Sequence, residues 1–163
     1  MFLDNVNILG FKFSVDSVSE LLSQINSIKK DGEIIQLLNA DSIVSKNQIY
    51  HAVNQAFLAF NRGENLAKDI GVEIVLRCSA QRQISKAFDI LGLKEGFMNL
   101  YVVLINCGDY SKELNSIFNS DELIFNCDEK HIMEIYNISN DEIINSSVED
   151  IIIDRITRLT VDF

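Results

Sequence analysis

Proline is absent from the 163 residues of this chain, and glycine occurs only seven times. The sequence therefore has no linker rich in proline, glycine or serine, and it contains no low-complexity run and no repeat at a fixed period. The hydrophobic fraction of 47% is typical of globular proteins. We therefore predict one domain spanning residues 1–163, a length that can bury a sizeable core.

Cysteine is also scarce: Cys78, Cys107 and Cys127 form an odd set without Cys-x-x-Cys spacing. This pattern argues against a disulfide framework and against a zinc site. The first residues lack the basic and apolar regions of a signal peptide, and no apolar run approaches the roughly 20 residues that span a bilayer. These absences predict a cytoplasmic protein whose thiols are largely buried.

Positive charge is in short supply, because 14 Lys and Arg residues face 24 Asp and Glu residues and the formal net charge is −10. Non-specific binding to duplex nucleic acid draws most of its affinity from Lys and Arg on phosphates, so this class of function is disfavoured. A ligand responds to the nearby field rather than to the net charge. A small local basic patch is therefore compatible with the sequence.

Apolar stretches bounded by turn residues predict the strands. They cover residues 2–13, as one strand or as a hairpin around Gly10, and residues 33–39, 72–78 and 99–107. The last stretch is the most hydrophobic and is predicted to be the central strand. Because the predicted strands alternate with helices, we expect the α/β or α+β class, with a central mixed sheet flanked by helices.

Capping boxes of the type Ser-x-x-Glu or Ser-x-x-Gln predict three helix starts, since both side chains satisfy backbone N–H groups that would otherwise be unpaired. The boxes begin at Ser17, Ser45 and Ser139. Ser79 is predicted to cap a further helix, and the last helix is predicted to begin near Ser147. Apolar residues at helical spacing also predict helices over residues 64–71, 111–118 and 128–136. Gly71 is expected to end the first of these.

Motifs for catalysis and metal binding are missing from the sequence. It contains no nucleophile elbow, Walker loop, dinucleotide-binding glycine pattern, HExxH or EF-hand loop. His51 and His131 have no second histidine at metal-ligand spacing, and Asp128 beside Cys127 is better explained as a helix cap than as a metal ligand. We therefore predict no catalytic residue, no metal site, no cofactor and no enzymatic activity of the chain acting by itself.

Four short motifs follow one another between residues 38 and 92. They read Asn39-Ala40-Asp41, Arg62-Gly63-Glu64-Asn65, Glu73-Ile74-Val75-Leu76 and Arg82-Gln83-Ile84-Ser85-Lys86-Ala87-Phe88. In this order and at this close spacing they resemble the small subunit of the KEOPS complex, a family that in eukaryotes includes the PRPK-binding protein. The last motif departs from the family pattern, since Phe88 stands in place of an isoleucine.

The resemblance implies a non-catalytic subunit of the complex that helps install threonylcarbamoyl-adenosine next to the tRNA anticodon. Members of this family bind and stimulate the small atypical kinase/ATPase of KEOPS. Archaeal members are similar to a receptor for the single-stranded 3′ CCA tail of tRNA. The expected partners are therefore this kinase, through it the rest of the complex, and the tRNA 3′ end, with no membrane.

Basic and amide side chains of the same region are the candidates for RNA contact. Lysine and arginine suit phosphates, a helix N-terminus near residues 81–83 offers N–H groups to an anion, and amides can hydrogen-bond base edges. The candidates are Asn61, Arg62, Lys68, Gln81, Arg82, Gln83 and Lys86. The structural alternative is that Arg62 complements the C-terminal end of a helix, while Arg82 and Lys86 are simply solvated.

The C-terminal helix carries an apolar stripe and is followed by a terminal phenylalanine. Apolar surface without an internal use often marks an interface. The candidates for kinase contact are Ile156, Leu159, Val161 and Phe163. The alternative is that Phe163 folds back onto the core of its own chain.

Two other functions are compatible with the sequence. One is a stand-alone domain that binds a small molecule or nucleotide at strand ends, near residues 39–41 and 107–109. The other is a scaffold that binds protein only, which would show no affinity for RNA.

Overall fold

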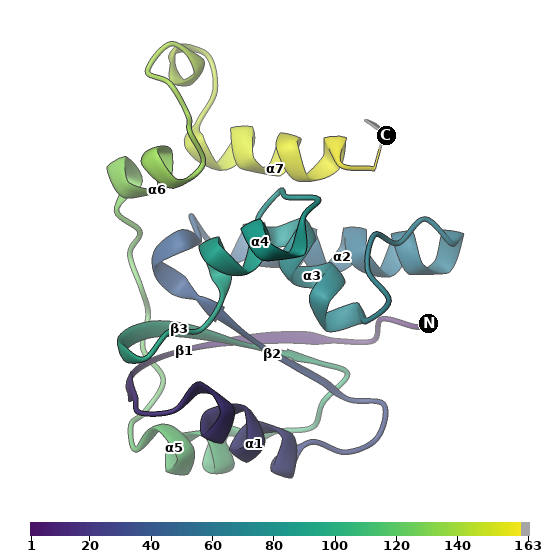
Figure 1. The fold of residues 1–163 in the computed structure, drawn as a ribbon, viewed down its shortest axis with the longest axis vertical. Coiled ribbons are helices and arrows are strands. Elements are labelled where there is room, and N and C mark those ends of the chain that lie inside the picture. Colours follow the sequence, from purple (N-terminus) through teal and green to yellow (C-terminus); the bar gives the residue numbers. More distant parts are fainter. Residues whose placement is uncertain (161–163) are drawn as a thin grey trace. The chain divides into compact units, whose positions relative to one another are not determined.

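The computed structural model describes residues 1–160, and the chain forms two compact units, each assembled from separate stretches (Figure 1). The sheet unit consists of Leu3–Ala40 and Gly92–Phe125. The helical unit consists of Met1–Phe2, Asp41–Leu91 and the chain from Asn126 onward. Neither unit corresponds to one continuous stretch of sequence, and the prediction of a single domain over residues 1–163 stays a prediction.

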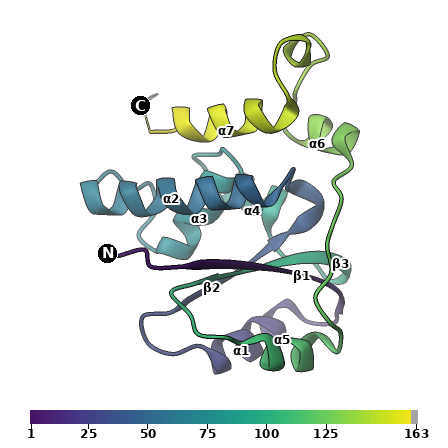
Figure 2. The ribbon, with the colours of Figure 1, turned by 180° about the vertical axis from the view of Figure 1, so that it is seen from behind.

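Three strands form the sheet of the sheet unit, in the order β1-β3-β2 (Figure 2). They are β1 at Val6–Val15, β2 at Ile34–Asn39 and β3 at Gly96–Ile105, and both pairings are antiparallel. The predicted α/β class is confirmed, and so is the central position of the most hydrophobic strand. The expected mixed pairing is wrong, because β3 runs antiparallel to both of its neighbours.

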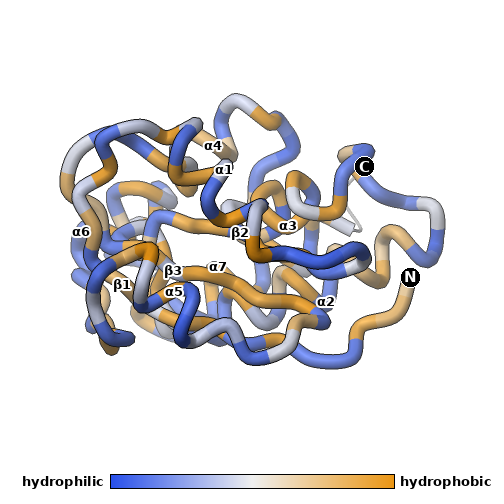
Figure 3. Tube along the Cα trace, turned by 90° about the horizontal axis from the view of Figure 1, so that it is seen from below, coloured by the Kyte–Doolittle hydropathy of each residue, from blue (hydrophilic) through white to orange (hydrophobic). Residues whose placement is uncertain are grey.

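Two helices cover one face of this sheet, α1 at Val18–Ile28 and α5 at Ser111–Phe118 (Figure 1). The Ser17 hydroxyl accepts a hydrogen bond from the Glu20 N–H at 3.3 Å, which confirms the predicted cap of α1. Every second residue of β3 enters the shared core, and Figure 3 shows the hydrophobic colouring along the strands. This core includes Leu21, Ile25, Met98, Leu100, Val102, Leu104, Leu114 and Phe118.

Gly10 lies within the continuous strand β1 and allows another segment of the chain to lie directly against the strand. Its carbonyl accepts a hydrogen bond from the Leu123 N–H at 2.7 Å. A Cβ atom at Gly10 would lie 2.5 Å from the Leu123 carbonyl oxygen and 2.8 Å from the Phe125 ring. The glycine therefore serves this close approach, and the hairpin considered around residue 10 is wrong.

Five α-helices of the described chain belong to the helical unit. They are α2 at Lys46–Arg62, α3 at Ile70–Cys78, α4 at Ile84–Leu91, α6 at Glu129–Ile135 and α7 at Val148–Arg158. Asp128 caps α6, as predicted, by accepting from the His131 N–H at 3.3 Å. The last helix begins after Ser147, as predicted, and Ser147 caps it by accepting from the Asp150 N–H at 3.1 Å. Within residues 1–160 no helix is both long and apolar enough to cross a membrane.

Gln48 lies off the apolar stripe in the sequence pattern of α2, yet its side chain is fully buried. Its amide nitrogen donates to the Cys78 carbonyl and to the Tyr136 hydroxyl, both at 2.8 Å, and its amide oxygen accepts from the Val44 N–H at 2.8 Å. The Tyr136 hydroxyl donates in turn to the Ser42 carbonyl at 2.6 Å. Gln48 thus joins α2, α3 and α6 through satisfied buried hydrogen bonds.

Residues 72–78 form the helix α3, so the strand predicted there is wrong. Asp69 caps this helix by accepting from the Val72 N–H at 3.0 Å, and Gly71 lies in its first turn instead of ending a helix over residues 64–71. All residues from Ile74 to Cys78 are buried. A helix without a polar face shows no helical periodicity, and its β-branched residues then suggest a strand.

Two predicted helix caps are also wrong. Ser79 ends α3, and α4 begins later, at Ile84. Ser45 directly precedes α2, but its hydroxyl makes no cap bond and donates to the carboxylate of Glu149 in α7. The Ser45 hydroxyl therefore bonds to Glu149, a residue distant in the sequence, and not to the backbone N–H of α2 that the motif predicts.

Candidate RNA and kinase interface

Three of the residues predicted to contact RNA, namely Asn61, Arg62 and Lys68, precede α3 and are exposed. Arg62 is the last residue of α2, and Gly63 closes that helix in the left-handed conformation (φ 72°). The side-chain oxygen of Asn61 accepts from the amino terminus of Met1 at 2.9 Å. The position of Arg62 at a helix C-terminus agrees with the structural role considered for it.

The other four predicted residues follow α3: Gln81, Arg82 and Gln83 connect it to α4, and Lys86 lies within α4. All but Gln81 are exposed. Because α3 has nine residues, it is about 13 Å long and separates these four residues from the first three. The structure therefore divides the seven predicted residues into two groups.

Arg82 lines a shallow hollow together with two arginines of α7 that the sequence did not single out for RNA. The hollow measures about 300 Å³, and its lining residues are Ala80, Arg82, Arg155, Arg158 and Leu159. A terminal nitrogen of Arg82 donates to the Leu159 carbonyl at 3.4 Å. We call this site the arginine hollow.

Each of the two α7 arginines has an acidic partner. Arg155 donates to the carbonyls of Tyr136 and, at 3.5 Å, Asn137, and it pairs with Glu142 at 3.3 Å. The Ser139 N–H and the charge of Arg155 hold the pKa of Glu142 below its usual value. Arg158 pairs through Nε with Asp154 at 2.9 Å, and both of these side chains are more than half exposed.

A second hollow of about 460 Å³ shares Arg155 and Arg158 with the arginine hollow. Its lining adds three acids, Glu142, Asp150 and Asp154. The two arginines thus line both hollows. Their carboxylate partners line the second one, and the charged residues that line the arginine hollow within residues 1–160 are Arg82, Arg155 and Arg158.

The turn after α3 places Arg82 beside α7. Ala80 adopts a left-handed conformation (φ 54°), and its N–H donates to the Arg77 carbonyl at 3.0 Å. The Gln81 N–H donates to the Leu76 carbonyl at 3.0 Å. These two bonds satisfy the last carbonyls of α3 and reverse the chain, so Arg82 leaves the helix in a defined direction.

A fully buried ion pair lies inside α3, between Arg77 Nε and Glu73 Oε2 at 2.8 Å. The other oxygen of Glu73 accepts from the N–H groups of Leu66 and Ala67, both at 2.7 Å. Arg77 also donates to the Thr160 hydroxyl at 3.0 Å, just beyond the end of α7. The pair therefore holds the segment before α3 and the end of α7, and the four-residue spacing of Glu and Arg was its only signal in the sequence.

The residues predicted to contact a kinase lie at the end of α7 and beyond. Ile156 is fully buried and Leu159 is 7% exposed, so both side chains pack inside the helical unit. Val161 and Phe163 lie outside the described residues. Contact of these four residues with a kinase stays a prediction. In this conformation the buried Ile156 would pack beneath such a surface and would not itself touch the kinase.

The two strand ends proposed for a small ligand lie at opposite ends of the sheet. Asn39 at the end of β2 pairs with Leu100, whereas Cys107 follows Ile105 at the far end of β3, which pairs with Ile34. Antiparallel pairing therefore places the two sites roughly 20 Å apart. The structure does not bring residues 39–41 and 107–109 together.

The Cys107 end of the sheet has a hollow of its own, of about 350 Å³. Next to it Glu33 accepts from the Tyr110 hydroxyl and from the Gly108 N–H, the latter at 3.3 Å. The bond to Glu33 raises the pKa of Tyr110 to about 12, and burial raises the pKa of the Cys107 thiol. Both shifts disfavour the deprotonated forms of Tyr110 and Cys107, which are their nucleophilic forms.

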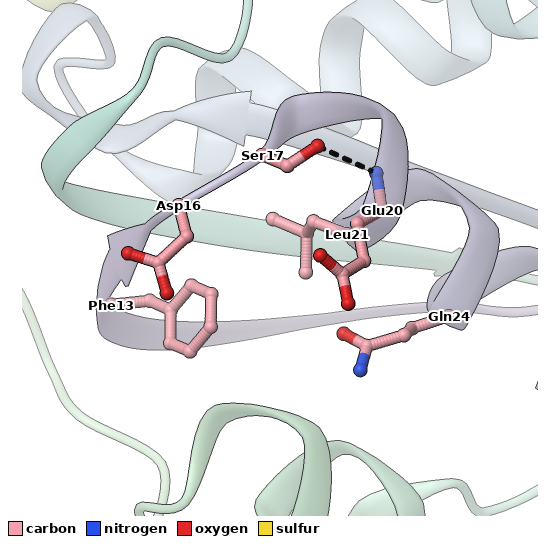
Figure 4. Close-up of a pocket in the computed structure, with 6 residues that line it drawn as sticks. All are labelled: Phe13, Asp16, Ser17, Glu20, Leu21 and Gln24. Atoms are coloured by element: carbon pink, nitrogen blue, oxygen red, sulfur yellow. Dashed lines mark hydrogen bonds between the residues drawn. The ribbon is translucent and has the colours of Figure 1, made fainter.

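A smaller hollow of about 130 Å³ lies at the start of α1 (Figure 4). Its lining combines the Phe13 ring and Leu21 with the polar side chains of Asp16, Ser17, Glu20 and Gln24. Ser17 is engaged in the cap of α1. The other polar groups are exposed acids and an amide, which is the usual composition of a solvated helix start.

Residues 13–158 match the model of a family of kinase-binding proteins. The family is described as kinase binding protein CGI-121, and because the match spans most of the 163 residues, this chain belongs to the CGI-121 family. The family resemblance read from residues 39–88 is thereby confirmed. The chain is also similar to the Regulatory protein Cgi121 of Methanocaldococcus jannaschii, at 41% identity over 71 residues. That alignment covers 44% of this chain and 46% of the relative, about half of its length.

Proposed function

We propose that this protein is a non-catalytic subunit of a KEOPS complex, in which it binds and stimulates the small atypical kinase/ATPase and recruits tRNA by its single-stranded 3′ CCA tail. The observation that carries the proposal is membership of the kinase-binding CGI-121 family over residues 13–158. The archaeal relative is named a regulatory protein, which supports a regulatory role in place of a catalytic step.

The arrangement of charge supports the RNA part of the proposal. The chain carries a net charge of −10, yet Arg82 and two further arginines line one hollow and Lys86 is exposed on the helix that follows. A basic area this small fits a few phosphates of a single strand better than the long backbone of a duplex. Gln83, also exposed, could hydrogen-bond a base.

The exposed face of α2 supports the kinase part. Tyr50, Asn54 and Leu58 repeat every four residues along it, and the two apolar side chains are 43% and 37% exposed. All 17 residues of α2 lack an acidic side chain, although the chain has 24 Asp and Glu. Interfaces are depleted of charge at their centre and enriched in aromatic residues. We therefore assign this face, together with the C-terminal residues Val161 and Phe163, to the kinase.

Charge reversal at Arg82 tests the RNA part. We expect Arg82→Glu to weaken the binding of full-length tRNA about tenfold or more at about 0.1 M salt, because one favourable phosphate contact becomes a repulsive one. The matched control is Lys112→Glu, at an exposed position on α5 of the sheet unit. Fluorescence anisotropy gives the affinities and thermal unfolding gives the Tm. Equal losses in the two variants would refute a localised RNA surface.

A further inference from the structure

We propose that the end of the strand pair β1–β3 is a platform on which one unpaired RNA base stacks against the ring of Phe97. The Phe97 side chain is 89% exposed, although it lies on a strand of the sheet unit. This inference rests on the proposed RNA-binding function and adds a second contact to it, on a different unit from the turn after α3. The group recognised is the face of a base together with a neighbouring phosphate.

The sheet narrows to two strands where the platform lies. β3 begins at Gly96 and pairs with β1 from its first residue, whereas β2 reaches β3 only from Leu100 onward. Met98 enters the core that α1 and α5 cover. Because side chains alternate between the two faces of a strand, Phe97 points to the opposite face, where Ser14 of β1 lies directly across from it.

Phe97 is the single apolar side chain among the four that share this face at the end of the strand pair. The other three are polar: Lys12, Ser14 and Asn99. A protein interface is apolar over the centre of a patch, whereas one ring is enough to stack one base. The exposed side chain of Leu123 lies beside Gly10, which is about 13 Å along β1 from Ser14. The isolated ring therefore favours a base over a protein surface.

Lys12 supplies a positive charge next to the ring. Its side chain is exposed, and it makes no ion pair with the described residues 1–160. Diagonal neighbours across an antiparallel pair are about 7–8 Å apart, a distance that a lysine side chain can span. Two exposed acids, Asp16 and Glu95, and one lysine, Lys94, flank the outer end of the strand pair. The local charge there is negative, so the phosphate belongs on the Lys12 side of the ring.

The strand pair holds these groups in place before a ligand arrives. Phe97 and Ser14 are directly paired in the ladder, which places their Cβ atoms about 5 Å apart. The Ser14 hydroxyl can therefore hydrogen-bond the ribose or the edge of the stacked base. Because the backbone is already ordered, binding loses little conformational entropy at this site.

A titration of the full chain with a labelled single-stranded RNA of about ten nucleotides, lacking a CCA end, tests the platform. We expect Phe97→Ala to weaken binding about fivefold or more, because stacking on the ring is lost, while Phe97→Tyr keeps the wild-type affinity. The matched control is Ile124→Ala in the same unit, which should leave the affinity unchanged, since Ile124 is also 89% exposed. Lys12→Gln should lower the slope of log affinity against log salt by about 0.7.

Two further measurements separate stacking from charge. An RNA of the same length without bases should bind the wild type and Phe97→Ala with equal affinity, because neither complex then contains a stacked base. In NMR spectra of the phenylalanine rings, the signal that Phe97→Tyr removes should shift when RNA with bases is added to the wild type. Thermal unfolding should give the same Tm for all variants, since the substituted side chains are exposed.

Equal RNA affinity of the wild type and Phe97→Ala, with the CCA tail still required for tRNA binding, would overturn the inference and leave the proposed function standing. Loss of kinase association in Phe97→Ala without loss of RNA affinity would assign the ring to a protein partner and overturn it too. A wild-type chain that binds neither the single strand nor tRNA would refute the proposed function itself.

Discussion

Glu73 and Arg77 show how one pair of residues organises the helical unit. Their ion pair is completely buried, and it also satisfies two N–H groups before α3 and the hydroxyl of Thr160 after α7. Arg158 and Asp154 have the same four-residue spacing on α7 but are largely exposed. Removing one partner of a buried pair leaves an uncompensated charge, whereas an exposed pair contributes little.

We therefore predict that Glu73→Gln lowers the free energy of unfolding by about 3–5 kcal/mol. The matched variant Asp154→Asn, which opens the exposed pair of equal spacing, should cost about 0.5 kcal/mol or less. Urea denaturation of both variants measures the difference. If the two substitutions cost the same, the buried network does not hold the helical unit together.

At the scale of elements, local signals predicted the helices whose ends are closed by nearby residues. Ser17 and Asp128 each cap a helix as expected, and α7 begins after Ser147 as expected, because the hydrogen bond that each of these residues makes lies within one turn. Helix α3 could not be read in this way, since burial on all sides removes the polar face on which a periodicity depends. The cap predicted at Ser45 is wrong for a related reason, because the Ser45 hydroxyl donates to Glu149, which lies far along the chain.

His51 joins α2 to α7 through a side-chain hydrogen bond. Its Nε2 lies 2.7 Å from the Thr157 hydroxyl, and burial lowers the pKa of His51 below its ordinary value of 6.5. A histidine with a lowered folded-state pKa binds fewer protons when folded, so its contribution to stability is present above pH 6.5 and is lost as the pH falls through the folded pKa.

We predict that the free energy of unfolding of the wild type falls more between about pH 7.5 and about pH 5.5 than that of His51→Gln. His131→Gln, at the exposed second histidine, is the control for the loss of an imidazole. Urea denaturation at the two pH values measures this. Identical changes in wild type and His51→Gln would show that the titration of His51 does not contribute to the pH dependence of stability.

The exposed face of α2 provides a second test at this scale. We predict that Leu58→Glu weakens association with the kinase partner at least tenfold, because a charge enters an interface centre that lacks acids. Leu22→Glu on α1 is the matched control, since Leu22 is 40% exposed and Leu58 is 37% exposed. Calorimetric titration with the kinase gives both affinities. A loss of kinase affinity in Leu22→Glu alone would indicate instead that the kinase contacts the sheet unit.

At the scale of the whole molecule, the residues of the candidate site come from distant parts of the chain. Arg82 was predicted from its place in a basic stretch, whereas Arg155 and Arg158 lie far along the chain on α7 and were not predicted. No local pattern relates them to Arg82, because the turn at Ala80 and the packing of α7 bring them together. The same packing encloses Ile156, whose spacing suggested an outer surface.

The proposed function combines these features: an acidic chain of the CGI-121 family presents a charge-poor helix face to a kinase and a small basic hollow to RNA. Such a hollow can hold a short single strand but cannot neutralise the many phosphates of a duplex backbone. Most of the affinity for tRNA should therefore come from its single-stranded tail. This requirement separates an RNA-recruiting subunit from a scaffold that binds protein only.

The most direct measurement compares full-length tRNA with the same tRNA lacking its CCA tail, titrated with this chain at about 0.1 M salt, with and without the kinase. We predict that removal of the tail weakens binding about tenfold or more, since the stacking and phosphate contacts of three nucleotides are lost. The same loss is expected when the kinase is bound. Equal affinity for the two RNAs would contradict recruitment of tRNA by its 3′ end.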